Sequence, residues 1–232
     1  GGGKLSLFAP VAAMERYGQL SALQLWGENP SEGAVMKFFI VSDIHGSATW
    51  CRKFVDAVEA ERPDKILLLG DVLYHGPRND LPEGYNPKEV IAMLNPLAER
   101  IIAVRGNCDA EVDQMVLDFP CMADYSTILD SEYVDENAEF ELCTPRTLFL
   151  THGHIYGPDR DGAAGILPKV PVNTALLYGH THKKVNEPCA EDPTLWLFNP
   201  GSLSLPKDGS HSFGTYTTGL PIEESFQHVE FC

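Results

Sequence analysis

The chain has 232 residues, of which 44% are hydrophobic, enough for one sizeable α/β domain and too many for a disordered chain. Its 33 acidic and 17 basic residues give a formal charge of −16, which disfavours extended contact with nucleic acid or with an anionic membrane. No apolar run approaches the roughly 20 residues that a membrane-spanning helix needs. The six cysteines show no C-x-x-C spacing, and we therefore expect reduced thiols and a cytoplasmic protein.

Residues 1–35 differ in composition from the remainder and are expected to be an N-terminal extension. They begin with three glycines and carry a short apolar stretch. Two interpretations stay open: a signal-like segment, although Pro10 interrupts its apolar part, or a non-native stretch upstream of a natural start at Met36. Residues 36–232 are expected to form a single domain.

The first part of this domain alternates predicted strands with predicted helices. The run from Lys37 to Val41 lacks polar alternation, which is typical of a strand buried on both faces. A helix is expected between Ser47, a suitable N-cap, and Pro63. Further elements are expected as strands at 65–69 and 101–104 and a helix at 88–99. This order is typical of βαβ units with parallel strands.

The second part is richer in predicted strands. They are expected at 125–129, 138–142, 146–150, 174–178, 194–198, 214–217 and 223–231. Together with the first part, this layout predicts an α/β fold in which two sheets pack on one another with helices outside.

Polar side chains with metal-binding chemistry follow five of the predicted strands. They are Asp43, His45, Asp71, Asn107, His152, His180 and His182. Each alone could be a turn residue or a partly buried imidazole, but open α/β sheets place their ligands at such strand ends. Carboxylate, imidazole and amide oxygen suit Mn²⁺, Fe²⁺ or Zn²⁺, and the lack of a thiolate cluster argues against structural zinc. Seven ligands are too many for one ion and suit two.

These motifs resemble, in order, those of the calcineurin-like metallophosphoesterases. The motifs are Asp43-Ile-His45, Gly70-Asp71, Gly106-Asn107-Cys-Asp109, His152 and Gly179-His180-Thr-His182. The resemblance covers residues 36–232 and is strongest to small bacterial phosphodiesterases of the YfcE type. It implies a two-sheet β-sandwich flanked by helices in four layers, α/β/β/α. It also implies a metal-dependent phosphohydrolase, with a phosphodiesterase favoured over a phosphomonoesterase or a non-catalytic protein-binding scaffold of this fold.

The resemblance further implies how the ligands are shared. It assigns one ion to Asp43, His45 and His182, the other to Asn107, His152 and His180, and the bridging position to Asp71. Two ions about 3.5–4 Å apart would share a hydroxide that attacks phosphorus in line. Manganese is expected, with Fe²⁺, Zn²⁺, Ni²⁺ and Co²⁺ as alternatives. The expected substrate is a small phosphoester, and a homo-oligomer is left open.

One position departs from the family pattern. Many members carry a histidine directly after Gly-Asn, where it is thought to protonate the leaving oxygen, and Cys108 stands there instead. We expect His75 to act as the acid with Asp109 as an orienting carboxylate, the alternative for His75 being a surface loop histidine. Arg78 and Arg105 are expected to bind the substrate beside Cys108, with Arg105 favoured as the catalytic cation, unless they pair with carboxylates instead.

Overall fold

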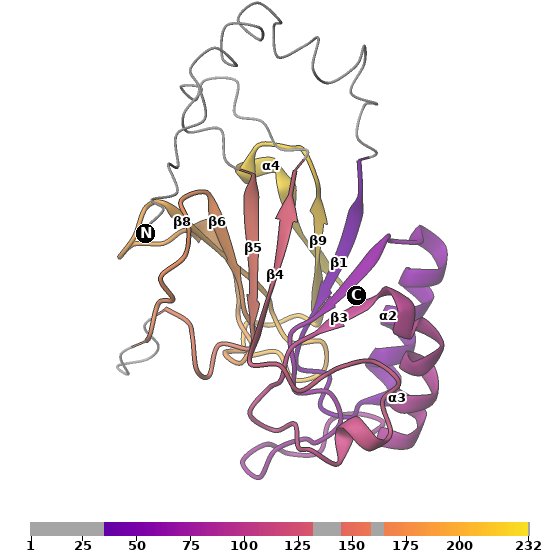
Figure 1. Cartoon of the computed structure of the whole chain (residues 1–232). Coiled ribbons are helices and arrows are strands. Elements are labelled where there is room, and N and C mark those ends of the chain that lie inside the picture. The colour runs from indigo at the N-terminus through magenta and orange to yellow at the C-terminus, as the bar shows by residue number, and fades with distance from the viewer. Residues whose placement is uncertain (1–34, 132–144, 159–164, 232) are drawn as a thin grey trace, which may run out of the picture. The chain divides into compact units, whose positions relative to one another are not determined.

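The computed structural model of the chain describes residues 35–131, 145–158 and 165–231 (Figure 1). The expected N-terminal extension lies outside the described residues except for its last residue. The predicted strand at 138–142 lies outside them as well. From Val35 onward the chain forms a unit of its own, whose strands are arranged in two sheets.

The first sheet has the strand order β10-β9-β1-β2-β3. Its members are β1 (Lys37–Val41), β2 (Lys65–Leu68), β3 (Ile101–Ala103), β9 (Ser212–Thr217) and β10 (Phe226–Glu230). β1, β2 and β3 are parallel, as the alternating pattern predicted, while β9 runs antiparallel to both β1 and β10. The carboxyl ends of three neighbouring strands therefore lie at one edge of this sheet.

The second sheet has the strand order β4-β5-β6-β8-β7. Its members are β4 (Tyr125–Asp130), β5 (Arg146–Thr151), β6 (Thr174–Leu177), β7 (Lys184–Pro188) and β8 (Leu195–Pro200). β5, β6 and β8 are parallel, and β4 and β7 are antiparallel edge strands. Figure 1 shows β1 and β5 running in the same direction, so both sheets bring their carboxyl ends to the same end of the sandwich.

Helices α2 (Ala48–Glu61) and α3 (Pro87–Leu94) cover the first sheet (Figure 1). The Ser47 side chain accepts a hydrogen bond from the Trp50 N–H at the start of α2, and Arg62 in the left-handed conformation ends the helix. The predicted helix 88–99 is α-helical only to Leu94 and continues as the 3-10 helix η2 (Asn95–Arg100). Pro96 explains this difference, because proline lacks the N–H that an α-helix would use there.

Two shorter elements complete the described chain. The 3-10 helix η3 (Asp113–Met115) precedes β4, and the single-turn helix α4 (Ile222–Ser225) precedes β10. The predicted strand 223–231 was therefore wrong in its first part. Pro221 lies directly before this turn, and Glu223 and Glu224 occupy its amino-terminal end, where acidic side chains favour a helix.

The core lies on both faces of the first sheet. Phe38 and Ile40 of β1 pack against the second sheet, whereas Phe39 and Val41 pack with α2 and α3. This confirms that β1 is buried on both faces. The outer face of the second sheet, around Phe149, is covered by loop residues such as those near Tyr156. The two-sheet sandwich is as predicted, and in the described ranges its helices cover the first sheet.

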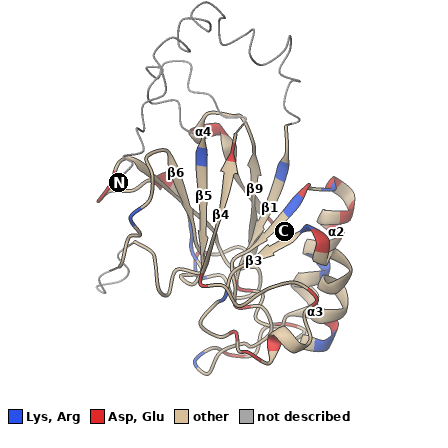
Figure 2. Cartoon of the chain, in the orientation of Figure 1, with Lys and Arg blue, Asp and Glu red and all other residues tan. Residues whose placement is uncertain are grey.

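Charged residues are interspersed over the surface of the described unit. Figure 2 shows Lys and Arg alternating with Asp and Glu on α2 and α3, and it does not show them gathered into one basic band. None of the helices in the described part of the chain is long and apolar enough to span a membrane.

Candidate metal centre

The predicted ligands follow the carboxyl ends of strands from both sheets and are tied together by backbone contacts. Asp43, after β1, donates its N–H to the Gly70 carbonyl at 3.1 Å. His180, after β6, donates its N–H to Asp43 Oδ2 at 3.0 Å. The first contact joins neighbouring strands of one sheet, and the second joins the two sheets. The centre is therefore assembled by the packing of the sandwich.

The backbone is strained at the predicted ligands. Seven described residues other than glycine have a positive φ, and five of them are predicted ligands. Their φ angles lie between 47° and 66°, at Asp43, His45, Asp71, His180 and His182. A residue held in this left-handed region costs of order 1–3 kcal/mol, and such residues cluster at functional sites. The fold holds these side chains in positions that relaxed strands would not give them.

Two glycines allow the strand ends to approach each other. A Cβ on Gly106 would overlap the carboxylate of Asp71, and a Cβ on Gly179 would overlap the side chains of Ser42 and Asp43. Only glycine fits at either position without a shift of the neighbouring ligand. The Gly-Asn and Gly-His pairs of the sequence are thus required by close packing.

Three imidazoles are oriented by backbone carbonyls. Each directs Nδ1 at a carbonyl oxygen: His45 at Tyr74 (2.8 Å), His152 at Leu69 (2.7 Å) and His182 at Leu205 (2.6 Å). Because a carbonyl can only accept, the proton of each neutral ring lies on Nδ1. The lone pair on Nε2 then points into the centre, which is how metal-binding histidines are commonly held.

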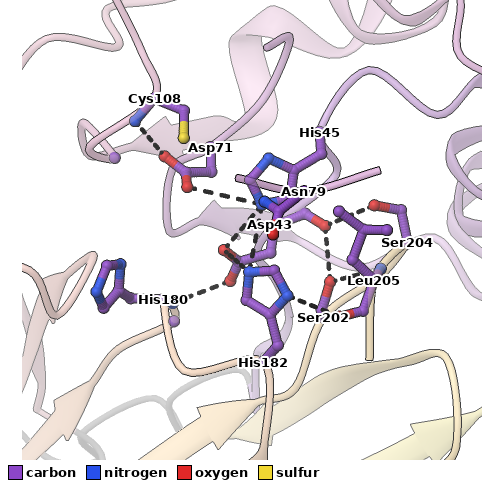
Figure 3. A network of polar contacts seen from close by, with 12 residues as sticks. Asp43, His45, Asp71, Asn79, Cys108, His180, His182, Ser202, Ser204 and Leu205 are labelled. Carbon is purple, nitrogen blue, oxygen red and sulfur yellow. Dashed lines mark hydrogen bonds and ion pairs between the residues drawn. The ribbon is translucent and has the colours of Figure 1, made fainter. Parts of the chain in front are cut away.

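The Nε2 atoms of His45 and His182 converge with Asp43 (Figure 3). Asp43 Oδ1 lies 3.1 Å from Nε2 of His182 and 3.5 Å from Nε2 of His45, and the two Nε2 atoms are 3.3 Å apart. Asp43 Oδ1 is buried and has no hydrogen-bond partner. Two imidazole nitrogens and a carboxylate oxygen that face one another at these distances form a donor set that fits a divalent cation. Asp43, His45 and His182 therefore fit the first ion.

A second group of donors adjoins the first through Asp71. Asp71 Oδ2 lies 3.3 Å from Nε2 of His152 and 3.7 Å from Nε2 of His45. Asn107 Oδ1 lies 3.1 Å from the same nitrogen of His152. Asp71 thus stands between the two groups, as expected for a carboxylate that bridges two ions.

The buried negative charge of the carboxylates must be balanced by positive charge at this centre. Burial raises the pKa of Asp43, but the adjacent His182 and His45 rings outweigh it and hold that pKa well below the usual value. Burial lowers the pKa of His152, but Asp71 and the charge of Asp43 outweigh it and raise that pKa to about 9. Protons on the imidazoles balance the carboxylates in the metal-free protein, and divalent ions would replace them.

His180 and His154 lie at the edge of this cluster. The His180 ring centroid is 5.2 Å from that of His152, close to the 5.1 Å between the His45 and His182 rings. Figure 3 shows the His180 ring set apart from His182. Burial, and then the charge of His152, lowers the pKa of His154 to about 4, so His154 is neutral at pH 7.

Two serines that the sequence did not single out as site residues hold Asp43 in place. The Ser202 and Ser204 hydroxyls donate to the Asp43 carbonyl at 3.0 Å and 3.1 Å (Figure 3). Ser202 lies just after β8, in an Asn-Pro-Gly-Ser segment that begins with the last two residues of that strand and has the sequence of an ordinary turn. The feature that could have identified Ser202 from the sequence is its position at the end of another predicted parallel strand.

A small cavity of about 60 Å³ opens onto the ligands. It is lined by His45, Asp71, Gly76, Pro77, Arg78, Asn79, Asn107, Cys108, His180, His182 and Lys207. Arg78 and Cys108, both predicted to bind the substrate, are thus among the lining residues. Lys207 had not been predicted, because nothing near it in the sequence marks it as part of a site.

Three predicted catalytic residues are placed differently. Arg105 donates from Nη2 to Asp124 Oδ1 at 2.6 Å and does not line the cavity, so it takes the alternative of pairing with a carboxylate. Asp109 accepts backbone N–H groups from Asp71, Val72 and Gly106 at 2.7–2.8 Å instead of orienting His75. The His75 ring packs edge-on against Tyr74 and Tyr85 and lies outside the cavity lining.

The Cys108 thiol faces the carboxylate of Asp71. The Cys108 N–H donates to Asp71 Oδ1 at 2.8 Å. Burial, with the negative charge of Asp71, raises the pKa of the Cys108 thiol to about 12. The thiol is therefore protonated at neutral pH and is a poor proton donor there.

A sandwich that joins carboxylates, imidazoles and an amide at its strand ends is the architecture of a two-metal hydrolase. Residues 36–219 match the calcineurin-like phosphoesterase superfamily domain, and the chain belongs to this superfamily. It is 43% identical over 176 residues to phosphodiesterase YfcE of Escherichia coli strain K12, covering 76% of this chain and 84% of that protein.

Solved structures give the same result. The structure of YfcE, a phosphoesterase from E. coli, matches with a TM-score of 0.67 and 40% identity over 84% of this chain and 98% of that chain. A novel archaeal phosphodiesterase shares the fold with a TM-score of 0.52 and 20% identity, over 84% of this chain and all of the other. The expected superfamily and its fold are confirmed.

Proposed function

We propose that this protein is a metal-dependent phosphodiesterase that hydrolyses small phosphoesters at the described centre. The observation that carries the proposal is the convergence of three imidazole Nε2 atoms on the buried carboxylates of Asp43 and Asp71. Membership of the phosphoesterase superfamily and similarity to a protein named phosphodiesterase support the reaction class. The interspersed surface charges support a small substrate rather than extended nucleic acid.

The ligands are divided between two ions in this proposal. Asp43, His45 and His182 hold one ion, Asn107, His152 and His180 hold the other, and Asp71 bridges them. The first set is supported by the distances around Asp43, and His180 by its place in the cavity lining. Oxygen and imidazole ligands suit manganese. Bound ions would supply charge neutralisation at the phosphoryl oxygens and water that ionises near neutral pH.

Groups of the chain itself position the ester. Arg78 lines the cavity and would donate to an anionic oxygen of the substrate. The protonated Cys108 thiol offers little acid catalysis, and His75 lies outside the cavity lining. We therefore expect the enzyme to favour esters whose leaving oxygen departs without a proton, such as esters of acidic alcohols. We also propose a cytoplasmic location, supported by four free cysteines among the described residues.

Metal analysis combined with a chromogenic assay tests this function. We expect two manganese ions per chain and turnover of bis(p-nitrophenyl) phosphate that chelation abolishes and Mn²⁺ restores. Asp71→Asn should lose both, because it removes the charge between the two groups of ligands. Asp56→Asn, at an exposed position on α2, is the matched control and should keep both.

The same assay separates the alternatives. Faster turnover of p-nitrophenyl phosphate than of the diester would indicate a phosphomonoesterase. A chain that binds no ions and turns over neither ester would refute the catalytic function and favour a scaffold.

A further inference from the structure

The cavity over the ligands is too small to enclose a whole ester. Its volume is about 60 Å³, on a measure in which one water molecule needs about 10–15 Å³, so it holds roughly four to six waters. Cavities that bury most of a small ligand measure about 300–1,000 Å³. Only a small group, such as the reacting phosphoryl group of the proposed reaction, can fill this cavity. The ester arms must therefore pass over its rim.

Two cations form part of that rim, and both are exposed. Arg78 lies in the loop after β2, and Lys207 lies in the loop after β8. The Lys207 N–H donates to the His182 carbonyl at 2.9 Å, so its backbone is tied to a predicted ligand. The loop of Arg78 is held by Asn79, whose side-chain amide donates to the His75 carbonyl at 2.8 Å. Both cations are thus carried by loops that are anchored at the site.

Neither cation has a carboxylate partner among the residues that the structure describes. Other basic side chains do: Arg105 pairs with Asp124 at 2.6 Å, and Lys184 pairs with Asp208 at 3.1 Å. Other exposed cations of the described chain also lack such a partner, but Arg78 and Lys207 lie at the cavity, where both charges are available to an anionic group. Within the described ranges, Asp71 is the only acidic residue that lines this cavity. The rim is therefore cationic in an otherwise acidic protein.

The charge of a simple phosphodiester does not account for this rim. A diester carries one negative charge at phosphorus, and divalent ions held by the buried ligands would already meet it. Exposed Arg and Lys side chains at the rim lie where the ester arms pass. They would be matched by a second anionic group on one of those arms.

We propose that Arg78 and Lys207 bind a second anionic group of the substrate, so that preferred substrates are phosphodiesters carrying a further phosphate or carboxylate on one ester arm. This inference rests on the proposed function, because it assigns the reacting phosphodiester to the metal centre. The two cations bind the substrate and leave the reacting bond untouched. Their contribution should therefore appear in KM and not in kcat.

A matched pair of chromogenic esters tests the inference on the manganese-loaded enzyme. The pair is thymidine 5′-(p-nitrophenyl phosphate) with and without a 3′-phosphate, which share the reacting bond and leaving group. We expect a lower KM for the ester with the 3′-phosphate. Arg78→Gln and Lys207→Gln should each reduce this advantage about two- to fivefold, the range of exposed charge contacts, and the double variant should abolish it.

Lys88→Gln, at an exposed position in the first turn of α3, is the matched control. It should keep the full advantage, because Lys88 does not line the cavity. Calorimetric titration provides a readout apart from turnover. The loaded protein should bind thymidine 3′,5′-bisphosphate more tightly than thymidine 5′-phosphate, and the double variant should bind the two equally.

The outcomes separate this inference from the proposed function. If the loaded protein hydrolyses neither ester, the proposed phosphodiesterase function fails. If it hydrolyses both with the same KM, or if the double variant keeps the advantage, the second anion site is refuted while the function stands. An equal loss in Lys88→Gln would also refute it, because the preference would then come from the overall charge of the protein.

Discussion

The metal-free protein should lose stability as the pH rises from 6 to 8. The buried carboxylate of Asp71 lies 3.3 Å from Nε2 of His152, and these charges raise the pKa of His152 from 6.5 to about 9. A histidine whose pKa is raised in the folded state stabilises the fold below its unfolded pKa. That stabilisation is lost as the pH rises through the folded pKa. His45, whose pKa Asp43 raises against the effect of burial, acts in the same direction.

The size of the effect follows from this shift. A shift from 6.5 to about 9 corresponds to at most about 3 kcal/mol of stabilisation below pH 6. Linkage leaves about 1.4 kcal/mol of this at pH 8, so the loss between pH 6 and pH 8 is about 2 kcal/mol. For a chain of this length, that lowers the melting temperature by about 4–8 °C. The range stops at pH 8, because unfolded thiols begin to ionise above it.

Thermal unfolding in excess chelator at pH 6, 7 and 8 measures this loss. His152→Gln should remove most of the pH dependence, because it removes the titrating ring. His228→Gln is the control, since burial lowers the pKa of His228 and its loss should leave the decrease in place. A melting temperature that is constant or rises between pH 6 and 8, or a decrease that survives in His152→Gln, would refute the reasoning.

Four further outcomes are expected. Gly106→Ala should reduce diester turnover at least tenfold, since its Cβ would overlap the Asp71 carboxylate, and wild-type rates in a folded variant would contradict this. Cys108→Ser should change kcat for a p-nitrophenyl diester by less than about threefold, because the thiol stays protonated; a loss above tenfold would show that it acts in catalysis. Arg105→Gln should lower the free energy of unfolding by less than about 1 kcal/mol and leave KM unchanged, because Arg105 pairs with Asp124 at a partly exposed position. Manganese at 100 times its Kd should stabilise the protein by about 2.7 kcal/mol for each ion bound, and an unchanged melting temperature would argue against binding to the folded state.

The local part of the fold and of the site could be predicted from the sequence. Strands such as β1 are continuous apolar runs, and the polar ligands follow them directly, so residue order alone places Asp43 and His45 at a strand end. Strand β7 was missed because its residues are polar and lie at the edge of the sheet, where pairing with β8 and not burial holds them. The end of the α-helix before Pro96 could have been predicted, because proline lacks the N–H that an α-helix needs.

Contacts between distant loops could not be predicted in this way. Arg105 meets Asp124 because β4 begins at Tyr125, directly after that carboxylate, and no periodicity of the sequence encodes the encounter. One backbone hydrogen bond to His182 holds Lys207 beside the cavity. His75 is adjacent in sequence to residues of the site, yet packing against Tyr74 and Tyr85 keeps it out of the cavity lining. Such placements depend on the packed sandwich as a whole.

The left-handed backbone at five predicted ligands has a consequence for how this protein could evolve. Those five residues together cost of order 5 kcal/mol or more, which is comparable to the entire net stability of many domains. Glycine adopts the same conformation without this cost. Selection for heat resistance alone would therefore favour glycine at positions such as His180 or His182, and metal binding would be lost. Thermal adaptation in this protein must instead come from residues outside the strand ends. Selection for metal binding retains the ligands even though their backbone conformation lowers the stability of the fold.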